Sequence, residues 1–533
     1  MSAKKTYGYL VIGAGPGGLQ AGHCLQQQGR DYLIVESGRR AGTSFERFPR
    51  HRKLISINKV HTGYSDPEIN LRWDWNSLLS SESTAARFTD YSQRYFPDAD
   101  DMPRYLDGFA KEHQLNVRTD SAVVNVRRDQ DFIVTLSTGE ELRARVLIVA
   151  TGVHLPWLPD IEGIEHAEHY VDMDIDPVPL TNKKVLILGK GNSGFETADA
   201  LMEHAAMIHV ASPNPLRMAW STHYVGHLRA VNNNLLDTYQ LKSQNAILDV
   251  ELHRIERDGD KFKAYFGYQH AEGEQEVIEY DRVIACTGFR FDDSMFDESC
   301  RPELCSRGRL PAQQADWQSQ NIPDLYFAGT LMQYLDYKKY MSGFIHGFRY
   351  NVRTLCQLLL ERYDGIALPQ VTHELQVAPT CERIIERVNQ SSALWQQPGF
   401  LQDVMLIDRQ QQRLSWHLEL PQDYIAQRFA ADEYMTLTLE FGQRKFDNPF
   451  NVSRIARENV KRAEDSNFLH PIVRHYRDGK LLAEHHTIED LAAEWREAEH
   501  IEPLLEFLSK QLPVEHRSPA VDAQKLWNVI STF

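Results

Sequence analysis

The stretch that decides the fold is Tyr9-Leu-Val-Ile-Gly13-Ala-Gly15-Pro-Gly-Gly18, an apolar run that ends in a glycine-rich turn. A helical pattern follows from Leu19 to Gly29. In such a unit the first glycine makes the tight turn, the second lets the backbone approach a pyrophosphate, and the third lets the helix pack on the strand. The helix N-terminus then offers N–H donors to the anion. The stretch therefore predicts a dinucleotide-binding unit.

A second copy of the pattern occurs at Lys184-Val-Leu-Ile-Leu-Gly189-Lys-Gly191-Asn-Ser-Gly194, followed by a helical pattern from Phe195 to His204. One glycine motif alone is weak evidence, but two copies that both stand between a strand and a helix are strong evidence. The duplication predicts an α/β fold with two Rossmann-like dinucleotide-binding domains.

The two copies differ at the end of their second predicted strand. In the first copy the strand Asp31–Val35 ends in Glu36, at the spacing where an acid accepts hydrogen bonds from a ribose diol. In the second copy the strand Met207–Ala211 ends in Ser212, and Arg217 follows. A hydroxyl and a guanidinium suit a 2′-phosphate, which an acid would repel. The second site is therefore expected to prefer NADPH, although Arg217 could also be a solvated loop cation.

Three further apolar runs are each followed by a Thr-Gly or Gly-Thr pair, where the chain could cross between domains. They are Arg145–Ala150, Arg282–Cys286 and Asp324–Ala328. From about Ala367 the glycine-rich punctuation disappears; Thr436–Phe441 alternates like a half-buried strand and Ile488–Leu508 has a helical pattern. We therefore predict four segments: residues 1–158 and 285–366 form an FAD-binding domain, residues 159–284 an inserted NADPH-binding domain, and residues 367–533 a C-terminal α/β appendage.

Composition excludes several classes of protein. The chain has 533 residues and a net charge of −16, which opposes binding to nucleic acid or to an anionic membrane surface. Six cysteines without a C-x-x-C pair are too few for a disulfide scaffold and fit a reducing compartment. No run approaches about 18 apolar residues, and cleavage after the N-terminal apolar stretch would destroy the first glycine turn. The sequence favours a cytoplasmic protein.

The order of these motifs resembles the class B flavin-dependent monooxygenases over roughly residues 7–360. Glu36–Phe45 resembles their flavin-contacting stretch, Leu54–Lys59 a segment with an active-site Asn, and Asp281–Phe289 a motif of N-hydroxylases. Val123 matches a strand residue whose backbone contacts adenine. A narrower resemblance is to FAD-dependent oxidoreductases of the endoplasmic reticulum; the segments that carry it are His51–Lys59, Thr222–Val225, Leu236–Ser243, Gly343–Tyr350 and Asn467–Pro471. The chain shows neither a secretory signal nor a KDEL-type ending, so that compartment is not carried over.

Together, motifs and resemblance imply two cofactors, FAD and NADPH, and three groups of site residues. The expected FAD contacts are Gly13, Gly15, Pro16, Gly17, Gly18, Glu36, Ser37, Gly42, Thr43, Ser44, Asn58, Val123, Ala150, Thr151, Gly152, Gly329, Thr330, Gly343 and Phe344. The expected NADPH contacts are Gly189, Gly191, Asn192, Ser193, Gly194, Ser212 and Arg217. Tyr334, Asp336 and Tyr337 are candidates to face the substrate, and no metal site is expected.

The resemblance implies that NADPH reduces the flavin, which takes up O2 as a C4a-(hydro)peroxyflavin and oxygenates a nucleophilic heteroatom. An amine nitrogen is slightly preferred, because of the Asp281–Phe289 likeness. Asn58 is the candidate catalytic residue that stabilises the oxygenated flavin, although it could be an ordinary turn residue. The substrate is expected to be a small molecule or a carrier-bound amino acid, and a homo-oligomer is possible.

Two other functions stay open at this point. One is an NAD(P)H-dependent flavin reductase that acts on a thiol, disulfide or quinone without oxygen insertion. Residues 37–70 contain no cysteine, which counts against a dithiol mechanism, and Cys300 and Cys305 are interpreted as reduced structural cysteines. The other is a non-catalytic flavoprotein that serves as a binding module.

Overall fold

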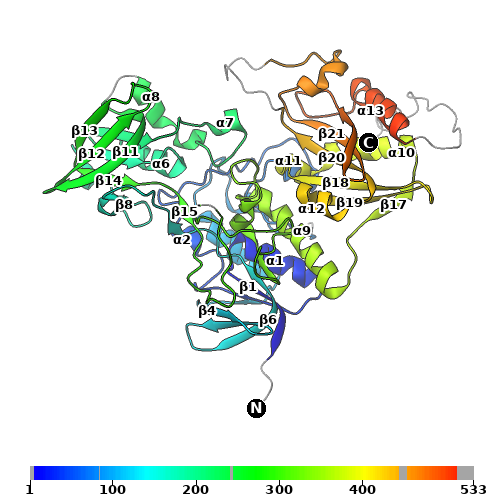
Figure 1. Cartoon of the computed structure of the whole chain (residues 1–533), viewed down its shortest axis with the longest axis horizontal. Helices are drawn as coiled ribbons and strands as arrows, with labels where there is room; N and C mark the ends of the chain where they lie inside the picture. The colour runs from blue at the N-terminus through cyan, green and yellow to red at the C-terminus, as the bar shows by residue number, and fades with distance from the viewer. Residues whose placement is uncertain (1–4, 83, 241–243, 306, 443–452, 513–533) are drawn as a thin grey trace. The chain divides into compact units, whose positions relative to one another are not determined.

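The computed structural model describes residues 5–82, 84–240, 244–305, 307–442 and 453–512 (Figure 1). Residues 241–243 of the segment Leu236–Ser243, and residues 443–452 and 513–533 of the predicted appendage, lie outside the described part. The chain divides into two compact units: residues 1–61, 74–312 and 318–334 form the first, and residues 62–73, 313–317 and 335–533 the second.

The first sheet of unit 1 is built around the first glycine turn. Parallel pairing joins β2, β1, β6 and β16, whereas β4 and β5 pair antiparallel. The strands, in sheet order, are β3 (Val117–Arg118), β2 (Tyr32–Val35), β1 (Thr6–Ile12), β6 (Glu141–Val149), β5 (Phe132–Leu136) and β4 (Val123–Arg128), with β16 (Leu325–Phe327) paired to β6. β16 returns to this sheet after the second dinucleotide unit, because its three apolar residues are buried beside β6.

The second sheet of unit 1 carries the second glycine turn and appears in green in Figure 1. Its strands, in sheet order, are β13 (Gln275–Tyr280), β12 (Lys261–Tyr268), β11 (Ala246–Asp258), β10 (Met207–Ser212), β9 (Lys184–Leu188), β14 (Arg282–Ala285) and β8 (Glu168–His169). A separate pair of short strands joins β7 (Leu155–Pro156) to β15 (Phe289–Arg290). Apolar residues of β9, β10 and β14 pack against Phe195 and Ala198 of the following helix.

The helices and 3-10 turns of unit 1 are mostly short. The α-helices are α1 (Pro16–Gln27), α2 (Ser44–Arg47), α4 (Phe88–Tyr91), α5 (Asp101–Glu112), α6 (Asn192–Leu201), α7 (Ala219–Thr222) and α8 (Asn234–Gln240). The 3-10 turns are η1 (Ile164–His166), η2 (Val178–Leu180), η3 (Ala230–Asn232) and η4 (Gly329–Tyr334). Both glycine turns stand between a buried strand and a helix, and the predicted fold class, with two Rossmann-type units, is confirmed.

Unit 2 contains an antiparallel sheet of six strands. They are, in sheet order, β17 (Val371–Glu374), β19 (Arg413–Pro421), β18 (Leu401–Asp408), β20 (Glu433–Glu440), β21 (His470–Arg477) and β22 (Lys480–His486). The accompanying helices are α3 (Pro67–Asn70), α9 (Ile345–Asp364), α10 (Val377–Gln390), α11 (Ser392–Gln396), α12 (Gln422–Arg428), α13 (Ala498–Gln511) and the 3-10 turn η5 (Val460–Asp465). Trp495 and residues of α10 and α13 complete the apolar core of the sheet.

Two details of unit 2 differ from the sequence interpretation. Within the expected strand Thr436–Phe441, residues 436–439 are buried on both faces rather than half-buried. The core that includes α10 and α13 covers the face with Leu437 and Leu439, and a cluster with Ile425 of α12 covers the face with Tyr434. The helix expected over Ile488–Leu508 begins only at Ala498, since Thr487, Glu489 and Asp490 are buried polar residues of the preceding loop. In addition, α9 belongs to unit 2, whereas the predicted domain boundary follows it at residue 366.

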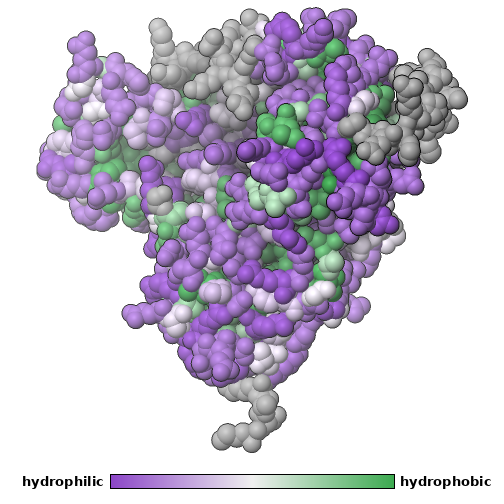
Figure 2. Space-filling model, turned by 45° about the vertical axis from the view of Figure 1, so that its right-hand side comes forward, coloured by the Kyte–Doolittle hydropathy of each residue, from purple (hydrophilic) through white to green (hydrophobic). Residues whose placement is uncertain are grey.

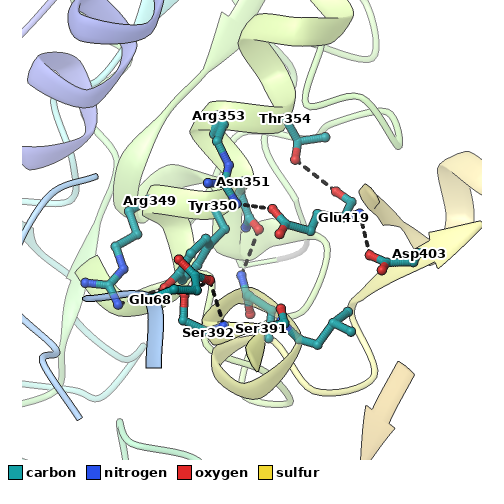
Figure 3. Close-up of polar contacts among 12 residues, drawn as sticks. Glu68, Arg349, Tyr350, Asn351, Arg353, Thr354, Ser391, Ser392, Asp403 and Glu419 are labelled. Atoms are coloured by element: carbon teal, nitrogen blue, oxygen red, sulfur yellow. Dashed lines mark hydrogen bonds and ion pairs between the residues drawn. The ribbon is translucent and has the colours of Figure 1, made fainter. Parts of the chain in front are cut away.

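Helix α9 packs on this sheet through polar as well as apolar side chains (Figure 3). Its Arg353 forms an ion pair with Glu419 of β19, and Arg387 of α10 contacts both Glu419 and Asp403 of β18. Thr354 donates to the carbonyl oxygen of Glu419 at 2.9 Å. Two arginines thus neutralise two buried carboxylates inside the unit, a balance that a low-dielectric interior requires.

Hydrophilic residues cover most of the molecular face in Figure 2, and hydrophobic residues appear there in separate groups. This agrees with the mean hydropathy of −0.47. No helix among the described residues is both long and apolar enough to cross a membrane.

We expect Arg387→Met to lower the free energy of unfolding by about 3–5 kcal/mol, because it leaves Asp403 and Glu419 with the charge of one arginine. Urea unfolding followed by circular dichroism measures this loss. Arg383→Met, an exposed change on the same helix, is the matched control and should stay within about 0.5 kcal/mol of wild type. Equal unfolding midpoints for the two variants would contradict the stabilising role of the cluster.

Candidate functional site

Helix α1 is brought close to β1 by a tight backbone turn. Gly13 has φ 102°, and a methyl group there would lie 2.8 Å from the carbonyl oxygen of Ala150. A methyl group on Gly18 would overlap the carbonyl oxygen of Gly13. By contrast, no protein atom lies within 4 Å of the place where a side chain of Gly15 would begin. The turn therefore leaves room at Gly15, beside the N-terminus of α1, for a close backbone approach to a phosphate.

Glu36 is a buried acid at the end of β2. Its carboxylate accepts hydrogen bonds from Ala14 N at 2.8 Å, Gly38 N at 2.8 Å and Thr43 Oγ1 at 2.8 Å. These bonds tie the end of β2 to the glycine turn and orient Ser37 and Thr43 around it. Gly42 adds a backbone bond to Ala14 O at 3.0 Å, and Ser44 starts α2.

Two later segments reach the same turn. Ala328 N donates to Val149 O at 2.9 Å, which places Gly329 against α1, and a methyl group on Gly17 would overlap the backbone of Gly329. Thr151 follows β6, and its buried Oγ1 has no hydrogen-bond partner within the described chain. The open cradle at Gly15, the ribose-type acid and this unpartnered hydroxyl all fit an FAD.

The second turn repeats the geometry of the first. Gly189 has φ 113°, and its added methyl would overlap the carbonyl oxygen of Cys286, as that of Gly13 approaches Ala150. A methyl on Gly194 would overlap the carbonyl oxygen of Gly189, while the space at Gly191 is open. The two turns are thus equivalent in backbone geometry, and the second also fits a pyrophosphate.

The side chains around the second turn differ from those around the first. Lys190 stands where the first turn has Ala14, and its Nζ donates to the carbonyl oxygens of Ser212 and Asn214 at 3.2 and 3.1 Å. Ser212 ends β10, and Arg217 is exposed. Of the two predicted 2′-phosphate residues, Ser212 therefore contacts a lysine, largely buried in its side chain, that sequence analysis did not select. The position of Lys190 between Gly189 and Gly191 was the feature of the sequence that could have identified it.

The side-chain amide of Asn192 is engaged within the protein, so its predicted cofactor contact would be made by the backbone at the start of α6. Its Nδ2 donates to the carbonyl oxygens of Gly226 and His227, and its Oδ1 accepts from Arg229 N at 3.0 Å. The amide thereby holds the loop 218–232 on the start of α6. Ser193 instead lines a cleft with Cys286 and Phe289.

Asn58 is buried, and its side chain is oriented by the neighbouring loop. Nδ2 donates to Ser92 O at 2.6 Å and to Arg94 O at 3.3 Å, whereas the buried Oδ1 has no partner among the described residues. Asn58 also forms a β-bridge with Asp74, and Gln20 of α1 hydrogen-bonds both backbone groups of Leu79 close by. The Asn58 side chain therefore presents a hydrogen-bond acceptor, because its amide N–H groups are already used.

The loop before Asn58 is fastened to the second dinucleotide unit by a buried polar chain. Arg50 N donates to the hydroxyl of Tyr170 at 2.9 Å, and that hydroxyl donates to Glu196 of α6. His51 contacts Thr197 at 3.3 Å. Burial raises the pKa of Glu196 to about 7, and burial together with Arg50 lowers the pKa of His51 to about 4. Sequence analysis missed this chain, since neither Tyr170 nor Glu196 belongs to a motif.

The remaining predicted residues fall in several places. Val123 begins β4, and Tyr334 ends η4, which Gly329 and Thr330 begin. Asp336, Tyr337, Gly343 and Phe344 belong to unit 2.

Asp336 is buried within unit 2. Its Oδ2 accepts a hydrogen bond from Ser342 N at 3.1 Å, its Oδ1 has no partner among the described residues, and burial raises its pKa to about 7. Tyr337 is exposed, and no group of three metal-ligating side chains occurs in the described residues.

Comparison with known families matches residues 10–329 to the pyridine nucleotide-disulphide oxidoreductases. The chain belongs to this family. A mouse relative, FAD-dependent oxidoreductase domain-containing protein 2, is 37% identical over 96% of this chain and 84% of its own length. The chain thus belongs to the family of FAD-dependent oxidoreductases, and the expected resemblance to class B flavin monooxygenases agrees with this family and with the fold.

Solved structures agree on the fold. A flavin-containing monooxygenase from Stenotrophomonas maltophilia aligns with a TM-score of 0.50 at 20% identity and covers 67% of this chain and 99% of its own. A bacillithiol disulfide reductase from Bacillus cereus aligns with a TM-score of 0.50 at 18% identity, over 67% of this chain and 100% of its own. Because one scaffold serves both reactions, its presence alone does not choose between them.

Gly15→Ala and Gly191→Ala test the two cradles separately. Neither methyl meets a protein atom, so both variants should fold, but each methyl would lie where a pyrophosphate approaches, which costs about 1–3 kcal/mol of binding. Gly15→Ala should be purified with less FAD, whereas Gly191→Ala should keep FAD and bind NADP+ about tenfold or more weakly. Flavin absorbance per protein and NADP+ calorimetry are the measurements. Loss of FAD from Gly191→Ala would contradict this assignment.

A pH-dependent stability difference should follow from Glu196. Its pKa is higher in the folded chain than its ordinary value of 4.5, so its stabilising contribution is complete below pH 4.5 and is lost as the pH rises through about 7. Glu196→Gln should therefore be more stable than wild type by up to about 3 kcal/mol at pH 8 and equal to it near pH 4.5. Unfolding followed from pH 4.5 to 8 tests this, with the exposed Glu203→Gln as control. Parallel curves for Glu196→Gln and wild type would refute it.

Proposed function

We propose that this FAD-dependent oxidoreductase is an NADPH- and O2-dependent monooxygenase that oxygenates a nucleophilic heteroatom, with an amine nitrogen as the first candidate. The first turn would hold FAD and the second NADPH. When bound, the flavin supplies hydride acceptance and oxygen activation. The chain's own residues would bind, orient and shield it.

The observation that carries this proposal is the state of the cysteines. None of the six, all of which lie in the described part of the chain, forms a disulfide, and burial raises the pKa of Cys286 to about 12 and that of Cys300 to about 11. Cys300 Sγ lies 3.2 Å from the carbonyl oxygen of Val126 and is not bonded to Cys305. A redox dithiol needs a lowered thiol pKa, because the thiolate is the reacting form. The raised pKa values of these two thiols therefore count against a redox disulfide within the chain as the electron acceptor of the reduced flavin. O2 is the electron acceptor that we propose.

Asn58 is proposed to orient the oxygen chemistry. Its Nδ2 donates to Ser92 O and Arg94 O, which orients the amide. The buried Oδ1, which has no partner among the described residues, can accept a hydrogen bond from a bound group. A hydrogen-bond acceptor whose orientation is already fixed does not have to reorient during a reaction, so little free energy is spent on reorganisation. The burial of Asn58 would also keep water away from the oxygen chemistry that a bound flavin supplies.

The remaining parts of the proposal concern substrate and surroundings. N-hydroxylation rests on the likeness of Asp281–Phe289, a segment in which Asp281 accepts from Lys184 N at 2.8 Å and so fixes the start of β9. We propose a small-molecule or carrier-bound amino-acid substrate, a cytoplasmic location and no nucleic-acid or membrane partner. The net charge of −16 supports the last point. Self-association is testable by light scattering.

The proposal is tested by reducing the FAD-loaded protein anaerobically with NADPH and mixing it with O2 in a stopped-flow spectrometer. A transient species whose spectrum differs from both oxidised and reduced flavin supports a monooxygenase and justifies a screen of amines, thiols and ketones. Direct reoxidation without such a species overturns the proposal and favours a reductase acting on another acceptor.

The same experiment tests Asn58. Asn58→Ala should shorten the lifetime of the transient species by about tenfold and raise H2O2 release, because one positioned hydrogen-bonding group is worth about 1.5 kcal/mol or more. Asn76→Ala is the matched control, since Asn76 is equally buried in the adjoining loop but both ends of its amide are already bonded, to Ser56 and Ile57. Equal lifetimes in Asn58→Ala and wild type would remove Asn58 from the reaction.

A further inference from the structure

The second turn contains a partly buried ion pair, whereas the first turn has the uncharged Ala14 at the position of the lysine. Lys190, between the first two glycines, is only 4% exposed, and its Nζ forms an ion pair with Asp249 Oδ1. The same Nζ donates to the carbonyl oxygens of Ser212 and Asn214. Four groups from the glycine turn, from the end of β10 and from β11 are thereby fastened at one corner of the sheet.

Asp249 is placed beside the residue that ends β10. It pairs with Ser212 in the parallel register of β10 and β11, and its side chain is 34% exposed. In a dinucleotide-binding unit the end of the second strand is the place where the adenosine ribose is recognised. A partly exposed carboxylate here would attract a 2′-hydroxyl and repel a 2′-phosphate.

The first turn provides an internal comparison. There Ala14 has no side-chain charge, and the hydrogen bonds that the Glu36 carboxylate accepts from Ala14, Gly38 and Thr43 come from backbone and hydroxyl donors. In the second unit the carboxylate belongs to Asp249 on β11, the strand next to β10, and the ammonium of Lys190 is paired with it. The two units therefore differ in the charge they present to a 2′-phosphate on equivalent backbones: an uncompensated carboxylate in the first and an ion-paired one in the second.

We propose that the Lys190–Asp249 ion pair determines nucleotide choice at the second turn: Lys190 neutralises Asp249 and fixes the backbone at Ser212 and Asn214, so that the site accepts a 2′-phosphate. Lys190 is a positioning residue, because its buried ammonium acts through Asp249 and the turn. The inference rests on the proposed function, in which this turn holds NADPH.

Charge alone predicts opposite effects for the two single substitutions. Lys190→Met leaves the carboxylate unpaired and should weaken NADP+ relative to NAD+ by roughly tenfold. Asp249→Asn leaves the ammonium unpaired and should strengthen the binding of NADP+ relative to that of NAD+. The double variant Lys190→Met/Asp249→Asn should return the ratio close to that of wild type, because both charges are gone.

The measurement is the dissociation constant of NADP+ and of NAD+ for the full-length, FAD-loaded protein by isothermal titration calorimetry, at two ionic strengths. The shift should shrink at the higher ionic strength, as expected for a partly exposed charge. Lys184→Met, a change of an exposed lysine at the opposite end of β9, is the matched control and should leave the ratio unchanged.

The outcomes separate this inference from the proposed function. If wild type does not prefer NADP+, NADPH use fails and the inference fails with it. If wild type prefers NADP+ but both single variants weaken the two nucleotides equally, the pair only supports the turn and the inference alone is overturned. Should Lys190→Met not fold, the direction of the shift in Asp249→Asn and in the double variant still decides.

Discussion

The close contact between the third glycine of each turn and the carbonyl oxygen of the first is the constraint on which unit 1 depends. Any side chain at Gly18 or Gly194 would overlap that oxygen, so each helix starts where the backbone alone allows it to touch the preceding strand. The amide groups at the N-termini of α1 and α6 are thereby fixed at the carboxyl ends of their sheets, which is where open α/β sheets bind ligands. Everything that distinguishes the two sites is a side chain added to this common backbone.

This constraint explains which parts of the fold could be predicted. Glycine identity at fixed spacing specifies the turn, and the apolar runs beside it specify buried parallel strands, so both dinucleotide units follow from sequence. Lys190 could not be predicted in the same way, because its partner Asp249 is far away in sequence and is brought near only by the pairing of β10 with β11. The Tyr170–Glu196 contact depends likewise on a tertiary approach that no local pattern encodes.

Unit 2 shows the limits of periodicity. The interacting residues of α9 include arginine, tyrosine, asparagine and threonine, which a hydropathy pattern assigns to a solvent-facing side. These side chains have specific polar partners: Arg353 pairs with Glu419, Thr354 donates to the Glu419 carbonyl oxygen, and the remaining residues bond Leu71, Ser392 and Ser342. Glu419 itself adopts a left-handed φ of 60° next to a shift in the register of β18 and β19. Such a conformation costs about 1 kcal/mol or more and persists only where the surroundings determine it. A charge network formed by α9, α10 and two strands becomes visible only after these elements have been assembled.

The α9 network also suggests why a flavoprotein of this kind carries a further unit. Gly343 and Phe344, expected to contact FAD, immediately precede α9, and Ser342 beside them accepts hydrogen bonds from Asn351 and from Gln397, which follows α11. The position of this segment within unit 2 is thus determined by residues beyond the two dinucleotide units. A helix whose polar side is satisfied by buried partners has few alternative orientations, since each would leave charged or amide groups unpaired. The C-terminal residues therefore act on the expected flavin-binding segment through the chain itself, by restricting the conformations open to residues 342–351.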